Sequence, residues 1–285
     1  MTYRRGGLVG WSRPWSFHPL IRPIPASDLG RLPFLPGLQT MAEYKARISC
    51  LASGNGSNLQ ALIDASASGI IAGTIVKVTV NRKDAYAVKR AESAQPPIPT
   101  DYFNLVKHGF LAPGEKDPEK VKEARFAYDT ALAARILADK PDLIVLAGWM
   151  HALPFHCPWL LSLKSPWLKS NNVVMSTGFL NPVAAAGVPI INLHRMYDGA
   201  GAIKRAYDDF QSGKLANGIT GIMIHYVVEE VDRGAPVMTQ EIEIRKGESL
   251  EDLEQRIHGY EHELIVKATA LLAEKIVAAK GSTTS

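Results

Sequence analysis

Cysteine is scarce in this chain of 285 residues, and long apolar runs are missing. The two cysteines, Cys50 and Cys157, are too few for a disulfide framework or for a zinc site built from cysteines alone. This usage suits a reducing compartment, and we expect a cytoplasmic location. No stretch approaches the roughly 18 unbroken apolar residues that a membrane span needs, so we expect no membrane partner.

Negative charge is almost absent from residues 1–40, which contain five arginines, no lysine and a single acid, Asp28. This segment accounts for the whole net charge of +4. Because the rest of the chain is neutral overall, we expect no nucleic-acid partner. The segment is rich in Pro, Arg and Trp, which predicts a disordered extension. It could be a transit peptide, although its prolines argue against an amphipathic helix; we favour an upstream extension with Met41 as the working start.

Strand-like and helix-like runs alternate beyond this segment, as in a parallel sheet with helices on both faces. The uninterrupted apolar run Leu143–Ala147 is typical of a strand in the middle of such a sheet. Two later runs, Gly221–Val228 and Val237–Ile244, predict an antiparallel return near the C-terminal end. The sequence therefore predicts an α/β fold with an open, mostly parallel sheet in one domain, residues 41–281, followed by a tail, residues 282–285.

A glycine-rich stretch, Ser53–Asn58, joins the strand-like run Ile48–Ala52 directly to the helix-like run Leu59–Ala67. Such a turn directs backbone N–H groups and the positive end of a helix at one place, which suits a phosphate. Three residues of this stretch are the candidates that hold it: Gly56, Ser57 and Asn58. The alternative is an ordinary tight turn between a strand and a helix.

The kind of phosphate ligand is narrowed by what this stretch does not contain. Leu59 occupies the position where a dinucleotide fingerprint needs a third small residue, and the next strand, Thr74–Val80, has no carboxylate at its tip. No Lys-Ser or Lys-Thr follows, which excludes the P-loop of nucleoside triphosphatases. A small phosphomonoester is the ligand that remains.

Asn192 and His194 alternate along a strand predicted to end at Leu193 or His194, so their side chains leave the sheet on the same face. Ligands of open α/β sheets bind at the carboxyl ends of the strands, where the glycine-rich stretch also lies. Asn can donate to an oxyanion and His can relay a proton near neutral pH. Asp232 follows in an acidic turn. It would complete a set of three groups, in which Asn192 is the hydrogen-bond donor, His194 is the acid and Asp232 is the partner of that acid. The alternatives are a histidine that caps its own strand and a solvated turn.

Ser249, with Asp252 three residues later, is a capping-box-like signal that predicts the start of the final helix. This helix carries one anomaly, because Glu261 falls on the apolar stripe formed by Leu253, Ile257, Leu264, Ala268 and Leu271. A carboxylate at such a position is costly to bury without a partner. No metal site is predicted, since His156 and Cys157 are adjacent but no second cluster supports them.

Taken together, these motifs resemble the phosphoribosylglycinamide formyltransferases, folate-dependent enzymes of purine synthesis. The resemblance runs from about Arg47 to Ala273 and implies a Rossmann-like fold. Four motifs carry it in the correct order: Ser53-Gly-Asn-Gly-Ser-Asn-Leu-Gln60, Leu146-Ala-Gly-Trp-Met150, Ile191-Asn-Leu-His194 and Val231-Asp-Arg-Gly234.

The resemblance implies a role for each matching residue and two small-molecule substrates, glycinamide ribonucleotide and 10-formyltetrahydrofolate. The catalytic trio is Asn192, His194 and Asp232, and Glu261 contacts the glycinamide part of the substrate. The stretch at Gly56, Ser57 and Asn58 holds the substrate phosphate. Residues expected to contact the formyl-folate are Arg125, Met150, His151, Ala152, Leu153 and Asn192.

The chain departs from the family pattern in two places. The family follows its catalytic histidine with proline, whereas this chain has Arg195 and a loop about four residues shorter. An insertion at about residues 155–175, with two of the five tryptophans, has no family counterpart. Both departures are consistent with translated non-coding sequence. Two other functions stay open: another formyl-folate enzyme of the hydrolase type, and a nucleotide-binding homologue with impaired catalysis.

Overall fold

The computed structural model describes residues 44–150, 175–197, 201–215, 217–228 and 235–282. All of them belong to the second of two units into which the chain divides, Met1–Glu43 and Tyr44–Ser285. The predicted N-terminal extension, nearly all of the predicted insertion and all but one residue of the predicted tail lie outside the described residues.

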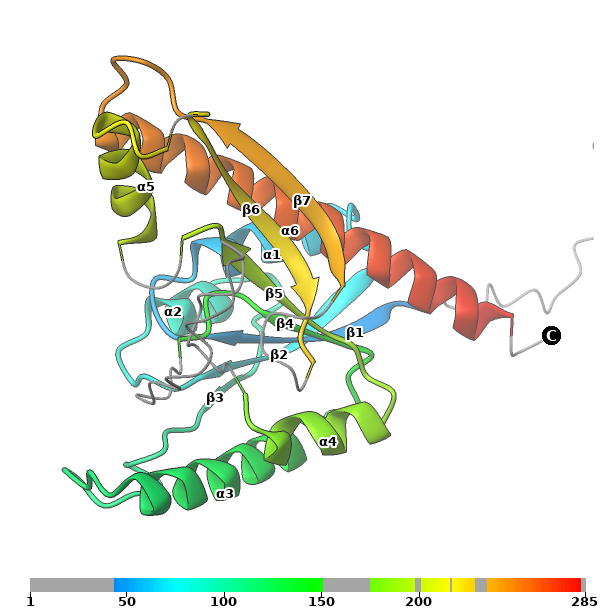
Figure 1. Cartoon of the computed structure of the whole chain (residues 1–285). Helices are drawn as coiled ribbons and strands as arrows, with labels where there is room; N and C mark the ends of the chain where they lie inside the picture. The colour runs from blue at the N-terminus through cyan, green and yellow to red at the C-terminus, as the bar shows by residue number, and fades with distance from the viewer. Residues whose placement is uncertain (1–43, 151–174, 198–200, 216, 229–234, 283–285) are drawn as a thin grey trace, which may run out of the picture. The chain divides into compact units, whose positions relative to one another are not determined.

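A seven-stranded sheet forms the centre of the second unit, in the order β3-β2-β1-β4-β5-β6-β7 (Figure 1). The strands from β3 to β5 are parallel, and β6 pairs antiparallel with both β5 and β7. The predicted mostly parallel sheet with an antiparallel return is therefore confirmed. The strands are β1 (Ala46–Ala52), β2 (Gly73–Val80), β3 (Thr100–Tyr102), β4 (Leu143–Leu146), β5 (Ile190–Arg195), β6 (Ile219–Tyr226) and β7 (Pro236–Glu243).

Helices cover both faces of this sheet, because the central strands are apolar on both sides. In β4, Leu143 and Val145 belong to the core beneath α1, α2, α5 and α6, whereas Ile144 and Leu146 pack on α3 and α4. Figure 1 shows α3 and α4 together on one side of the strands. The helices are α1 (Ser57–Ala67), α2 (Tyr86–Glu92), α3 (Pro118–Leu137), α4 (Thr177–Ala185), α5 (Ala202–Gln211) and α6 (Leu250–Gly281).

Local signals account for most of these boundaries. Ser249 caps α6 as predicted, with its Oγ accepting from the backbone N–H of Asp252 at 3.1 Å. Two details differ from the prediction. The buried residue near the end of the α6 stripe is Leu272 rather than Leu271. Strand β5 continues to Arg195, because that residue still pairs with Ile222 of β6.

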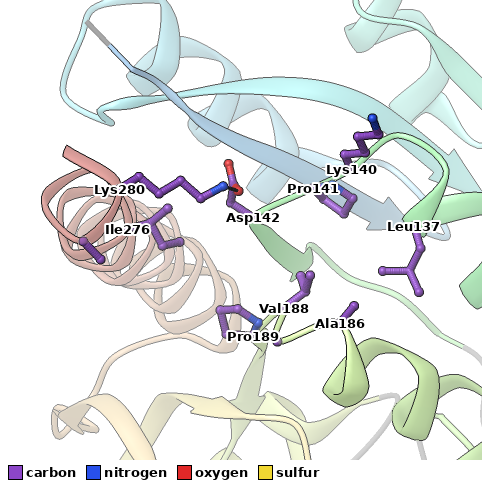
Figure 2. A pocket seen from close by; sticks show the side chains of 11 residues that line it. Leu137, Lys140, Pro141, Asp142, Ala186, Val188, Pro189, Ile276 and Lys280 are labelled. Atoms are coloured by element: carbon purple, nitrogen blue, oxygen red, sulfur yellow. Dashed lines mark hydrogen bonds and ion pairs between the residues drawn. The ribbon is translucent and has the colours of Figure 1, made fainter. Parts of the chain in front are cut away.

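A cavity of about 470 Å³ lies at the amino-terminal edge of the sheet, which is the side at which the parallel strands begin. It is bounded by the residues that precede β4 and β5 and by the last turns of α6, and Figure 2 shows Lys280 of α6 extending towards Asp142. This edge is opposite to the one at which the glycine-rich stretch emerges. Among the helices that the structure describes, none is both long and apolar enough to span a bilayer.

Candidate active site

The glycine-rich stretch forms the turn between β1 and α1, as predicted. Gly56 is the N-cap residue of α1 and has φ 71°, a left-handed conformation that favours glycine. A Cβ on Gly56 would lie 2.9 Å from Cβ of Ala87, so there is also no room for a side chain. No side chain caps α1, and the first N–H groups of a helix have no partner within it. These amides, from Ser57 onwards, form a place where an anion can bind.

Hydrogen bonds fix this turn against the segment that follows β4. Oγ of Ser53 accepts from the backbone N–H of Met150 at 2.7 Å, and the backbone N–H of Ser53 donates to the carbonyl of Gly148 at 3.1 Å. Nδ2 of Asn81, after β2, donates to the carbonyl of Met150 at 3.1 Å. The segments that follow the neighbouring strands β2, β1 and β4 are thus hydrogen-bonded to one another, which fixes the conformation of the turn.

Asn192 and His194 lie at the end of β5, two strands away from this turn. In the register, Asn192 is aligned with Leu146 of β4, which is aligned with Leu51 of β1. Because neighbouring strands are about 4.8 Å apart, β5 lies roughly 10 Å from β1. The side chains of Asn192 and His194 are half-buried. A ligand of nucleotide size can therefore reach from the α1 amides to both residues.

His194 lies close to a second histidine, His225 of β6. The rings of His194 and His225 are 5.9 Å apart and nearly perpendicular. Nδ1 of His225 donates to the carbonyl of Tyr226 at 2.9 Å, and the residue is buried. His225 therefore packs beneath the imidazole of His194 and helps to fix its position.

The third member of the predicted trio, Asp232, lies outside the described residues. His151, Ala152 and Leu153, three of the predicted folate contacts, also lie outside them. Their roles therefore stay predictions.

Glu261 is buried, and its partner is Arg195, which sequence reasoning did not identify. Nε of Arg195 donates to Oε1 of Glu261 at 2.5 Å, and Nη2 donates to Oε2 at 3.0 Å. The Glu261 side chain is 2% exposed and the Arg195 side chain 31%. This ion pair explains how a carboxylate can lie on the apolar stripe of α6. Both oxygens of Glu261 already accept a hydrogen bond from Arg195 while the pair is closed.

The two sets of candidate residues lie on opposite faces of β5. Arg195 shares its face with Ile191, which packs in the α6 core, whereas Asn192 and His194 share theirs with Ile190, which packs in the α3 and α4 core. A ligand that contacts both sets must therefore lie across the carboxyl-terminal edge of the sheet.

Next to Glu261, His262 has an unusual environment. Burial lowers the pKa of His262, the charge of Glu261 acts to raise it, and His258 and Arg90 act to lower it. Nε2 of His262 is buried, and no hydrogen-bond partner for it occurs among the described residues. The neutral form of this imidazole is therefore favoured.

The two remaining folate candidates differ in exposure. Met150 has its backbone fixed by Ser53 and Asn81, but its side chain is 67% exposed at the carboxyl-terminal edge. Arg125 is 2% exposed and pairs with Asp129, with Nε donating to Oδ1 at 2.9 Å. Met150 is thus accessible to a ligand, whereas the side chain of Arg125 forms part of the interior.

Comparison with known protein families shows to which family the chain belongs. The model of the formyl transferase family matches residues 46–157 and 176–269, and the chain belongs to that family. The break between the two matched stretches falls inside the segment predicted to be an insertion.

More specific similarities confirm the resemblance predicted from the motifs. The chain is 36% identical to a phosphoribosylglycinamide formyltransferase from Schizosaccharomyces pombe over 78% of its own length and 95% of the relative. It is 39% identical to one from Dictyostelium discoideum, over 80% and 98%. Among solved structures, glycinamide ribonucleotide transformylase 1 from Symbiobacterium toebii matches with a TM-score of 0.57 and 27% identity, over 81% of this chain and 89% of that one.

Proposed function

We propose that this protein transfers the formyl group of 10-formyltetrahydrofolate to the amine of glycinamide ribonucleotide, a step of purine synthesis. The observation that carries the proposal is that the candidate groups lie at the same edge of the sheet. The uncapped amides of α1 lie beside the end of β5, with Asn192 and His194, at a distance that a ribonucleotide can span. The family membership and the names of the similar proteins support the same reaction.

The mechanism uses these groups in sequence. The amides and short side chains of Gly56, Ser57 and Asn58 hold the substrate phosphate, which brings the glycinamide amine towards β5. The amine attacks the formyl carbon, and the oxyanion that forms accepts hydrogen bonds from Asn192 and protonated His194. The new C–N bond stays while the bond from the formyl carbon to N10 of the folate breaks. The amine loses one proton and N10 gains one, with Asp232 and water as the relay.

Other residues hold the two substrates. Glu261 contacts the glycinamide part, which requires that its pair with Arg195 opens. Met150 to Leu153 and Asn192 contact the folate, while the predicted contact of Arg125 would require its buried side chain to leave the interior, where it pairs with Asp129. Both partners are small molecules, with no nucleic acid, metal or membrane involved, and the protein acts in the cytoplasm.

The test is a steady-state assay of formyl transfer on three proteins: the wild type, Asp232→Asn and His194→Ala. We expect turnover by the wild type and a loss of roughly 10²- to 10⁴-fold in kcat for each variant. Calorimetric titration should show that both variants still bind glycinamide ribonucleotide with nearly unchanged affinity.

Three outcomes would contradict the proposal. Unchanged activity of Asp232→Asn would remove that residue from the mechanism. Binding of the nucleotide by the wild type without turnover would indicate an impaired homologue. Release of formate from the folate at the same rate without nucleotide would indicate a hydrolase.

A further inference from the structure

Arg90 of α2 uses each of its three guanidinium nitrogens to bind the glycine-rich turn or the start of α1. Nε donates to the carbonyl of Asn55 at 2.8 Å, and Nη2 donates to Oδ1 of the same residue at 3.2 Å. Nη1 donates to Oε1 of Gln60 in the first turns of α1 at 3.2 Å. One planar side chain therefore joins the turn to the helix that follows it.

The turn is held by α2 from a second direction as well. The backbone N–H of Ala87 donates to the carbonyl of Gly54 at 3.2 Å, and the Ala87 side chain packs where a Cβ of Gly56 would lie. Asn55, between the two glycines, is exposed, so nothing but Arg90 restrains its side chain among the contacts of the described residues. Two glycines in a row of six residues would otherwise leave the turn conformationally free.

The position of the Arg90 guanidinium is fixed further by an aromatic ring. The guanidinium lies 5.0 Å above the ring of Tyr86, which fixes its plane. Its charge is among the causes that lower the pKa of His262 on α6.

We infer that Arg90 is a positioning residue for the substrate phosphate and sets the preference for phosphorylated over unphosphorylated substrates. It acts through Asn55 and Gln60, which it holds so that the amides from Gly56 to Asn58 converge. This role rests on the proposed function, because it deepens the phosphate site of that reaction.

The experiment compares Arg90→Met with the neighbouring Lys89→Met. Lys89 is exposed on the same helix and lies 5.6 Å from the same Tyr86 ring, so its replacement removes an equal charge without touching the turn. For Arg90→Met we expect KM for glycinamide ribonucleotide to rise about tenfold, with kcat changed less than about threefold, as one charge-assisted contact is lost. For Lys89→Met we expect both constants to stay within about twofold of the wild type.

A second substrate separates a phosphate effect from general damage. With the unphosphorylated glycinamide riboside, kcat/KM of Arg90→Met should equal that of the wild type. Arg90→Lys keeps the charge but not the planar fork, and we expect it to behave like Arg90→Met. An unchanged KM in Arg90→Met, equal losses for both substrates, or a KM rise of the same size in Lys89→Met would overturn the inference.

Binding of inorganic phosphate gives a readout that does not need turnover. Backbone amide shifts of Ser57 and Asn58 should saturate at lower phosphate concentration in the wild type than in Arg90→Met. If the proposed reaction failed while this difference persisted, Arg90 would still be assigned to an anion site. Identical titrations in both proteins would overturn the role of Arg90 whatever the reaction is.

Discussion

The polar groups at the two edges of the central sheet, where the parallel strands begin and where they end, differ in whether the chain itself supplies their hydrogen-bond partners. At the amino-terminal edge, Asp142 accepts hydrogen bonds from the Tyr44 hydroxyl and from the backbone N–H of Arg47. It also pairs with Lys280, as Figure 2 shows beside the cavity. The chain supplies every partner of this carboxylate itself, so the group stabilises the fold.

At the carboxyl-terminal edge, two buried polar atoms are without a hydrogen-bond partner among the described residues. Oδ1 of Asn58 and Nε2 of His262 have none in the part of the chain that the structure describes, and no side chain caps α1. Buried polar groups in folded proteins are nearly always hydrogen-bonded, so such atoms indicate a site for a ligand. The candidate site thus has, in the described part of the chain, unpartnered buried polar atoms but does not coincide with the cavity, which lies at the other edge.

The largest expected effect comes from Gly56→Ala, which should distort the turn at the carboxyl-terminal edge. A φ of 71° and a Cβ 2.9 Å from Cβ of Ala87 predict a loss of about 2–4 kcal/mol in the free energy of unfolding. The affinity for glycinamide ribonucleotide should fall at least roughly tenfold, because the amides of α1 shift. Chemical denaturation and calorimetric titration measure the two effects.

Gly54→Ala is the matched control for this substitution. A Cβ on Gly54 would meet nothing within 4 Å, and its φ is not in the left-handed region. Stability and affinity should therefore stay near the wild-type values. Equal damage from both substitutions would contradict the account of the turn.

The next effect, at the amino-terminal edge, is on stability alone. Asp142→Asn should lower the free energy of unfolding by about 1–3 kcal/mol at pH 7, since a charged acceptor is lost, and should leave kcat and KM unchanged. The exposed pair of Lys204 and Asp208 on α5 provides the control, because Lys204→Met should change stability by less than about 0.5 kcal/mol. A change of KM in Asp142→Asn would contradict the division between the two edges.

The pH dependence of this difference gives a sharper test. Burial acts to raise the pKa of Asp142, but the hydrogen bonds from Lys280 and Tyr44 outweigh it and hold the pKa below its usual value. The stabilisation is therefore fully present above the unfolded pKa of about 3.9, and it is lost as pH falls through the folded pKa. Denaturation curves of the wild type and Asp142→Asn should differ at pH 7 and converge only once the pH lies below the lowered pKa of Asp142 in the folded protein.

The smallest effect on binding concerns Arg195, which lies at the ligand edge but has its charge satisfied internally. While Arg195 holds both oxygens of Glu261, a substrate must open the pair before it can reach the carboxylate. Arg195→Met should therefore lower the Kd for glycinamide ribonucleotide about three- to tenfold, because this opening is no longer needed. The same substitution leaves Glu261 buried without a partner among the described residues, so it should also lower the free energy of unfolding by roughly 3–5 kcal/mol. A higher Kd, measured by calorimetry, would instead show that the substrate contacts Arg195 itself.

Local patterns in the sequence predicted much of the fold and part of the site. The glycine-rich turn before α1, the cap at Ser249 and the parallel strands follow from residue type and spacing, and the structure shows all three. The alternation along β5 correctly placed Asn192 and His194 on one face, although the strand runs one residue further.

The parts that the sequence could not predict are contacts between distant residues. Arg90 and Asn55 are 35 positions apart, and Arg195 and Glu261 are 66 apart, with no repeating pattern to join them. Arg195 had one signal, the replacement of the expected proline, whereas Arg90 had none. The burial of Arg125 was also missed, because a charged residue on a helix is usually exposed until its partner, here Asp129, and its covering elements are known.

The central claim is that the amino end of α1 anchors the phosphate of the substrate. The most direct measurement follows backbone amide chemical shifts during titration with glycinamide ribonucleotide. The account predicts that the largest shifts, saturating together, occur at Gly56, Ser57 and Asn58. Shifts confined to residues around the cavity at the opposite edge, such as Asp142 and Lys280, with none at the turn, would contradict it.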